Sequence, residues 1–153
     1  MQAYFSIKKF TFLALVVLVC INCSSDDDAV ISYDLTGSWR VVAFTVEGTT
    51  ITKTAENTWP DFNNGDITAI LTEPNAEGEG EITGFTVTNA YNGTYTIQEG
   101  GEIAIGPVAT TFINEPEWTQ YYKISGAEQY EIRNEKLFIY YNNKSNTIVL
   151  ERL

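Results

Sequence analysis

Short runs of β-branched and aromatic residues, separated by turn residues, recur along most of the sequence after residue 34. They lie at 38–46, 67–71, 82–88, 93–98, 102–106, 107–112, 129–133, 136–141 and 147–153. Turn-forming residues mark most of the gaps, and Glu99-Gly100-Gly101 is typical of a tight hairpin. We expect 51–66 to be irregular and 72–81 to be an acidic loop or hairpin end. Short strands at this spacing predict a mainly β fold of the α+β class, a small, highly curved antiparallel sheet or barrel-like meander.

Residues 114–126 carry the signals of one helix. Asn114 is a candidate N-cap, and Glu117 lies three residues later as its capping-box partner. Spacings of three and four place Trp118, Tyr121, Tyr122 and Ser125 on one face. We expect this helix to pack against the curved sheet and to plug one open side of it.

The chain contains no histidine, and 20 acidic against 9 basic side chains give it a net charge of −11. The absence of histidine excludes Ser-His-Asp and Cys-His catalysis and every histidine-ligated zinc or iron site. A protein this acidic repels nucleic acid and anionic lipid headgroups, so neither is an expected direct partner. We expect no enzymatic activity and no cofactor.

The segment 61–66, "DFNNGD", is the nearest approach to a metal-binding motif. An EF-hand loop needs glycine at its sixth place and glutamate at its twelfth, but here those places hold Asp66 and Thr72. Glycines separate the nearby glutamates of 77–81, and such a loop holds carboxylates too loosely for catalysis. We therefore interpret both segments as ordinary surface loops and expect no metal site.

Residues 1–22 have the parts of a secretory signal peptide. Lys8 and Lys9 precede an apolar run of 12 residues from Phe10 to Ile21, and the run ends at cysteine. A helix needs roughly 20 apolar residues to span a bilayer, so this run predicts a cleaved signal rather than a membrane span.

The cysteines at the end of this run resemble a bacterial lipoprotein signal, in which the cysteine after the cleavage site receives the lipid. Cys23 is the favoured attachment site because it follows the small, polar Asn22, whereas Cys20 follows Val19. The next residues, Ser24, Ser25, Asp26, Asp27 and Asp28, are similar to the acidic export signal of Bacteroidetes outer-membrane lipoproteins. A solvated spacer is the alternative interpretation. Residues 23–34 are then an acidic tether, and the resemblance implies a lipid-anchored protein of the outer membrane, exposed on the surface if the export signal operates.

Several motifs follow one another from residue 35 to residue 153. They are "LTGSW" with Trp39, "NAYNGTY" with Asn89, Tyr91, Gly93 and Tyr95, "IAIGPVATTF" with Thr110 and Thr111, then "NEPEW" and the terminal meander. In this order they resemble the META domain, the family of the HslJ heat-shock lipoprotein. Two cysteines that are frequent in that family are missing, since Thr88 stands at one place and none follows Phe112.

The META resemblance implies an envelope-associated protein with a non-catalytic binding role or a role in envelope stress and maintenance, and with no accepted enzymatic activity. We interpret its motif residues as mainly structural, because Gly93 permits a bulge and Asn89 can bond loop amides. Binding of an envelope protein, a glycan or a small molecule is the alternative role. The "GSW" motif and terminal meander are also similar to a lipocalin-like lipoprotein domain, which would need an apolar cavity rather than a filled interior.

Overall fold

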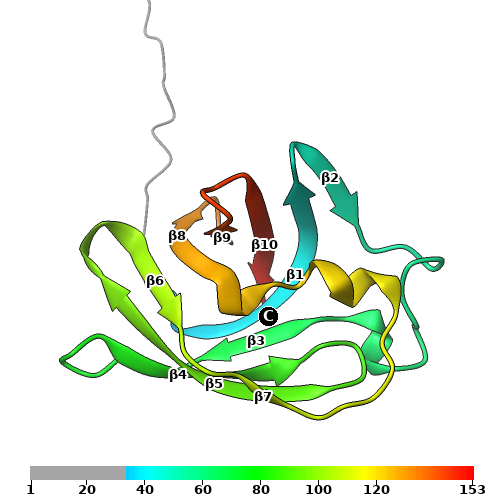
Figure 1. The fold of residues 1–153 in the computed structure, drawn as a ribbon, viewed down its shortest axis with the longest axis horizontal. Coiled ribbons are helices and arrows are strands. Elements are labelled where there is room, and N and C mark those ends of the chain that lie inside the picture. Colours follow the sequence, from blue (N-terminus) through cyan, green and yellow to red (C-terminus); the bar gives the residue numbers. More distant parts are fainter. Residues whose placement is uncertain (1–33) are drawn as a thin grey trace, which may run out of the picture.

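The computed structural model describes residues 34–153 (Figure 1). The strands are β1 Gly37–Val46, β2 Thr49–Thr52, β3 Thr68–Leu71, β4 Glu79–Phe85, β5 Ala90–Gln98, β6 Glu102–Ile105, β7 Ala109–Thr110, β8 Ala127–Arg133, β9 Lys136–Tyr141 and β10 Asn146–Arg152. Four short 3-10 helices connect them: η1 Asn63–Gly65, η2 Glu99–Gly101, η3 Glu117–Tyr121 and η4 Ile124–Gly126.

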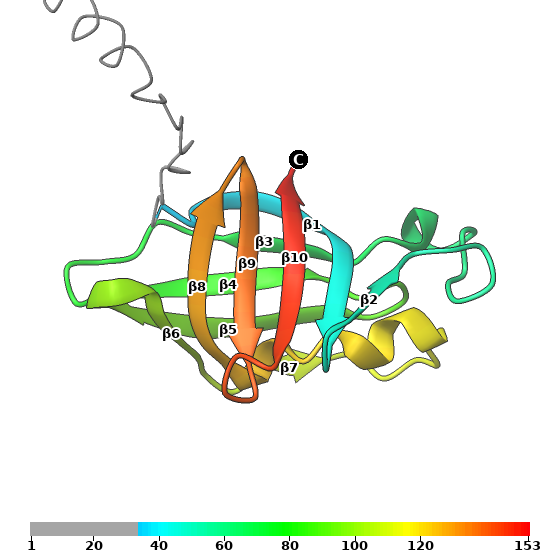
Figure 2. The same cartoon turned by 90° about the horizontal axis from the view of Figure 1, so that it is seen from above.

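Eight of the strands form a closed antiparallel ring. They pair in the order β10-β9-β8-β6-β5-β4-β3-β1, and β1 pairs back with β10. β2 extends β1 as a hairpin, and β7 pairs with β5 beside the ring. Figure 2 shows β8, β9 and β10 crossing over β3, β4 and β5. The predicted mainly β, barrel-like meander is therefore confirmed.

Side chains fill the interior of the barrel. Alternate strand residues point inward, so Ile148 and Leu150 of β10 are buried while Val149 and Glu151 are partly exposed. The largest completely buried side chains are Leu35, Trp39, Phe44, Ile67, Leu71, Ile82, Tyr95, Trp118, Leu137, Ile139, Ile148 and Leu150. The closed ring and its core both lie within residues 34–153.

The two ends of the barrel are closed by different parts of the chain. The Arg152 end comprises 34–36, the β5–β6 and β8–β9 turns and Arg152 itself. The loop end comprises 53–66, 86–89, 106–126 and the β9–β10 turn. In Figures 1 and 2 the loops at 53–66 and 111–121 extend from the same side of the molecule.

The region predicted as one helix differs from the expectation in its detail. It holds the short helices η3 and η4, and Pro116 rather than Asn114 occupies the N-cap position of η3, without a side-chain cap. The predicted capping box is wrong because the Asn114 carbonyl instead accepts a hydrogen bond from Thr88 Oγ1 at 2.9 Å, which keeps this residue beside the β4–β5 turn. Trp118 is buried, and its ring lies 4.6 Å from that of Phe44 of β1.

Two strand predictions also change. β2 extends to Ile51 and Thr52, into the 51–66 stretch that we expected to be irregular, and it forms because Glu47 and Gly48 both adopt positive φ in a two-residue turn of the kind that suits hairpins. Of the predicted strand 107–112, only Ala109 and Thr110 pair, since Pro107 has no N–H to donate.

At the Arg152 end, the side chain of Arg152 lies over the ring of Trp39 and binds backbone carbonyls of the 34–36 segment. The Arg152 guanidinium lies 4.5 Å from the ring centroid of Trp39, and it donates to the carbonyls of Thr36 at 2.8 Å and Asp34 at 3.3 Å. Trp39 Nε1 donates to the Leu35 carbonyl at 2.9 Å. At Gly37, where φ is +130°, a Cβ atom would lie 2.6 Å from Arg152 Nη1, which explains the glycine of the "GSW" motif.

We expect Arg152→Ala to lower the free energy of unfolding by about 1–3 kcal/mol, because it removes a cation–π contact and leaves two carbonyls without their donor. Arg133→Ala is the matched control. Arg133 also lies over a ring, at 4.2 Å from Phe138, but its other partner is the nearby Glu131 carboxylate at the surface, so we expect a loss below about 1 kcal/mol. Urea unfolding of both variants measures the difference, and equal losses would contradict this role for Arg152.

Candidate functional site

A pocket of about 540 Å³ opens at the loop end of the barrel. It lies where the β4–β5 turn, β5, β7, η3 and η4 meet. Its lining consists of Thr86, Tyr91, Val108, Thr110, Glu115, Pro116, Glu117, Thr119, Gln120, Tyr122, Lys123, Ile124 and Ser125. We call this the loop-end pocket, and it combines apolar, hydroxyl, amide and charged groups.

Two buried tyrosine hydroxyls line the loop-end pocket. Tyr91 donates to the Thr68 carbonyl at 2.8 Å, and the hydroxyl oxygens of Tyr91 and Tyr122 are 2.6 Å apart. Because the Tyr91 proton is committed to Thr68, Tyr122 must donate to Tyr91. The Tyr122 oxygen keeps its acceptor capacity for another donor.

Burial keeps both tyrosines protonated. It raises the pKa of Tyr91 well above its ordinary value, and the hydrogen bond with Tyr122 offsets part of the rise. Burial also raises the pKa of Tyr122, and the neighbouring Tyr91 adds to the rise. The pair is therefore a neutral hydrogen-bonding unit at neutral pH rather than a base.

The other polar groups of the pocket fall into two sets. Glu115 accepts a hydrogen bond from Thr86 Oγ1, and Glu117 accepts one from the Tyr121 hydroxyl at 3.4 Å. Gln120, Lys123 and Ser125 have no side-chain hydrogen bond or ion pair within the described part of the chain, and all three are exposed. These three side chains are free to contact a bound molecule.

Asn89 holds the 111–113 segment, which lies between the pocket-lining residues Thr110 and Glu115. Its Oδ1 accepts from Ile113 N at 2.7 Å and from Thr111 Oγ1 at 2.9 Å, and its Nδ2 donates to the Ile113 carbonyl at 2.8 Å. Thr110 Oγ1 donates to the Ala90 carbonyl at 3.2 Å. Asn89 is buried and its amide is fully used, so this motif residue holds the segment before η3 in place, in keeping with the structural interpretation.

The structure brings together only part of the family motif. Asn89, Tyr91, Thr110 and Thr111 lie around β5 and β7 at the loop end, whereas Trp39 lies under Arg152 at the opposite end. Gly93 permits β5 to pass close to the 107–108 backbone, since a Cβ there would lie 3.0 Å from the Pro107 carbonyl oxygen. Tyr95 fills the core, and its hydroxyl donates to the Thr72 carbonyl.

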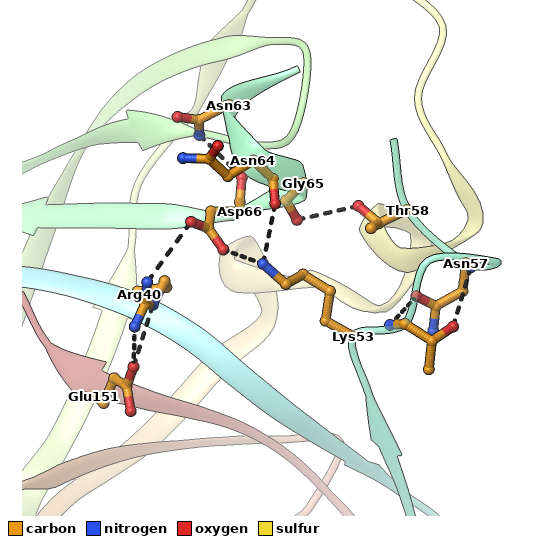
Figure 3. A network of polar contacts seen from close by, with 10 residues as sticks. Arg40, Lys53, Asn57, Thr58, Asn63, Asn64, Gly65, Asp66 and Glu151 are labelled. Carbon is orange, nitrogen blue, oxygen red and sulfur yellow. Dashed lines mark hydrogen bonds and ion pairs between the residues drawn. The ribbon is translucent and has the colours of Figure 1, made fainter. Parts of the chain in front are cut away.

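The "DFNNGD" segment is part of a salt-bridge network (Figure 3). Asp66 pairs with Lys53 and lies 3.8 Å from Arg40, which also pairs with Glu151. Asn63 Nδ2 donates to the Asp66 carbonyl at 3.0 Å. The carboxylate that would serve a calcium ion is therefore already paired with two cations. Across residues 34–153, no three His, Cys, Asp or Glu side chains are grouped closely enough to hold a metal ion.

The residues predicted for lipid attachment and export, Cys23, Ser24, Ser25, Asp26, Asp27 and Asp28, lie outside the described residues. Within 34–153, no helix has both the length and the apolar character of a membrane span.

Sequence reasoning did not find Gln120, Lys123 or Ser125 as site residues. They belong to the region expected to form one regular helix, in which Ser125 was placed on the face of Trp118 and the two tyrosines, and Gln120 and Lys123 were not singled out. Pro116 could have indicated the short helix, because its extended backbone directly precedes the 3-10 helix η3.

Comparisons with known proteins do not assign this chain to a family. No family model matches the sequence, and no curated protein matches it. A crystal structure of a DUF4847 family protein from Bacteroides vulgatus is similar, with 17% sequence identity and a TM-score of 0.49, over 77% of this chain and 93% of that chain.

We expect the Tyr91–Tyr122 pair to make the protein less stable at high pH. A raised folded-state pKa means that the unfolded chain loses these protons first, so the free energy of unfolding falls as pH rises above about 10, by about 1.4 kcal/mol per pH unit for each such tyrosine. Tyr122→Phe removes one of the two protons and should reduce the slope accordingly. Urea unfolding between about pH 9 and pH 11.5 measures the slope. Parallel curves for the wild type and Tyr122→Phe would show that Tyr122 does not contribute.

Proposed function

We propose that this chain is a lipid-anchored envelope protein that binds a small molecule in the loop-end pocket and does not catalyse a reaction. The observation that carries the proposal is the pocket itself, about 540 Å³ in volume and lined by free polar groups beside a buried hydroxyl pair. Pockets for small ligands usually measure about 300–1,000 Å³ and combine apolar walls with a few placed polar groups.

Two family interpretations bear on this proposal. Tyr91 and Thr110, two of the residues that carry the META/HslJ-like resemblance, line the pocket, and Asn89 holds the neighbouring 111–113 segment. The closed eight-stranded meander is an architecture that lipocalins share, but its filled interior lacks the apolar cavity that the lipocalin-like alternative requires. Because large side chains fill the barrel, we place the ligand at the rim instead of inside.

The chemistry of the lining supports binding rather than catalysis. Val108, Pro116 and Ile124 supply apolar surface, and Gln120, Lys123 and Ser125 supply hydrogen-bonding groups. The carboxylates of Glu115 and Glu117 already accept hydrogen bonds from hydroxyl groups. The buried tyrosines are protonated, so none of these groups is prepared to act as a strong base.

The position of the pocket suits an anchored protein. Asp34, the first described residue, lies at the Arg152 end, where its carbonyl accepts from Arg152. The loop-end pocket lies at the other end of the barrel. A lipid on Cys23 would therefore hold the protein by the end that faces away from the pocket, leaving the pocket open to the surroundings.

We expect the neutral, polarity-sensitive dye Nile red to bind the wild-type protein and to lose at least about tenfold in affinity with Ser125→Trp, because the indole would occupy the pocket. Thr50→Trp, an equal substitution at an exposed position of β2 outside the pocket lining, is the control and should bind the dye normally. Fluorescence titration measures both affinities. If the two variants bind alike, the dye site and the proposed ligand site are elsewhere.

The anchor is tested separately, on protein extracted from its native membranes. We expect the intact mass to correspond to an acylated chain beginning at residue 23, and Cys23→Ala to abolish the acylated species, since that thiol is the proposed attachment point. An unchanged acylated mass in Cys23→Ala would refute the anchor. Protease treatment of intact cells then distinguishes an outward-facing protein, which is cleaved, from a periplasmic one, which is protected.

A further inference from the structure

The hydroxyl groups that line the loop-end pocket direct their protons into the protein. Thr119 Oγ1 donates to the Pro116 carbonyl at 2.8 Å, and Tyr91 donates to the Thr68 carbonyl at 2.8 Å. The other lining hydroxyls that bond within residues 34–153 do the same: Thr86 to Glu115, Thr110 to Ala90 and Tyr122 to Tyr91. A hydroxyl group has one proton, so each of these five oxygens can only accept a hydrogen bond from a bound molecule.

The buried side of the pocket therefore presents side-chain acceptors without side-chain donors. Tyr91, Thr119 and Tyr122 are the buried polar residues of the lining, and all three belong to the set whose protons are committed. The side-chain donors that remain free lie on exposed residues: Gln120, Lys123 and Ser125. A group that binds at the buried side must supply protons to these oxygens.

Two carboxylates add charge to this set of acceptors. Glu115 and Glu117 line the pocket, and neither forms an ion pair with another side chain of residues 34–153. A carboxylate only accepts hydrogen bonds, and each of these two receives one, from Thr86 and from Tyr121. Most of their lone pairs are therefore available to a ligand.

The charge of the pocket favours a cation. Lys123 is the one basic residue of the lining, so two carboxylates and one ammonium give the lining a net charge of −1. The whole chain has a net charge of −11, and its field attracts cations and repels anions. Local and overall charge thus favour the same kind of ligand.

The hydrogen-bonding capacity of the ligand can be matched to that of the pocket. An ammonium group has three donors and no acceptor, which suits a surface of acceptors. A hydroxyl group of a ligand would supply one proton and would place its own lone pairs against those of the pocket. A carboxylate would supply none. Val108, Pro116 and Ile124 provide the apolar wall for the rest of the molecule.

We propose that the ligand of the loop-end pocket is a small protonated primary amine with a short apolar chain. This inference rests on the proposed binding function and adds the chemical class of the ligand. The ammonium group donates to the buried hydroxyl oxygens and is balanced by Glu115 and Glu117, and its hydrogen bonds are strengthened by its charge. The chain packs on the apolar wall.

Three ligands of equal chain length test the class: hexylammonium, hexan-1-ol and hexanoate. At pH 7 the amine is protonated and the acid is ionised. We expect hexylammonium to shift NMR amide signals of η3 and η4 in the purified protein, with a dissociation constant of about 1 mM for a ligand of this size. It should bind at least about tenfold more tightly than the other two.

The outcomes separate this inference from the proposed function. If hexan-1-ol or hexanoate shifts the same signals and binds as tightly as hexylammonium, the pocket binds small molecules but the ligand class is wrong. If none of the three shifts these signals, the proposed function is contradicted and this inference is overturned with it.

The matched variants are Glu115→Gln, Glu117→Gln and Glu81→Gln. Each keeps the shape of the side chain and removes one negative charge, but Glu81 is exposed on β4 and lies outside the pocket lining. We expect each pocket variant to weaken hexylammonium binding at least about threefold and to leave hexan-1-ol binding unchanged. Glu81→Gln should bind hexylammonium as the wild type does. Equal losses in all three variants would assign the effect to net charge and overturn the site.

Lys123→Gln is expected to have the opposite effect. It removes the one positive charge of the lining, so hexylammonium should bind at least about twofold more tightly while hexan-1-ol is unaffected. Weaker binding of hexylammonium by Lys123→Gln would contradict a cationic ligand. The amide spectra recorded in these titrations also show that every variant is folded.

Discussion

The pairing of β1 with β10 is the contact on which the rest of the structure depends. It joins the first and last strands of the described chain, from Trp39 opposite Arg152 to Val46 opposite Asn146. Without it the sheet would have two free edges, and the inward-facing side chains could not enclose a core. Its register also places Arg152 over Trp39 and Glu151 beside Arg40. The pairing that closes the barrel therefore also forms this cation–π contact and this ion pair.

The β1–β10 pairing also determines how the loop end is held. Arg40 contacts Glu151 of β10 and Asp66 of the 53–66 loop, and Lys53 of that loop pairs with Asp66. The loop in turn contacts η3, because the Asn57 carbonyl accepts from Trp118 N at 2.8 Å. Two loops far apart in the sequence are thereby fixed to the barrel and to each other, which gives the neighbouring pocket a defined shape although its walls are irregular.

The barrel presents two surfaces with different chemistry. The loop-end pocket gathers hydroxyl, amide and charged groups around apolar walls, as a small ligand requires. The outer side of β3 and β4 instead exposes Ile70 and Phe85, with Arg40 and Glu81 in the same or the adjoining rows of the sheet.

The sequence alone predicts the features that depend on local chemistry, namely the existence of most strands, the hairpin at Glu99-Gly101 and the mainly β class. Alternation and turn residues act over a few positions, so these features are visible without tertiary contacts. It did not reveal that the 114–126 region forms 3-10 turns, because that depends on Thr88, which lies on a distant turn and holds the Asn114 carbonyl. The pocket likewise arises only when the closed register places residues from separate strands and loops side by side, and register depends on long-range packing rather than on local pattern.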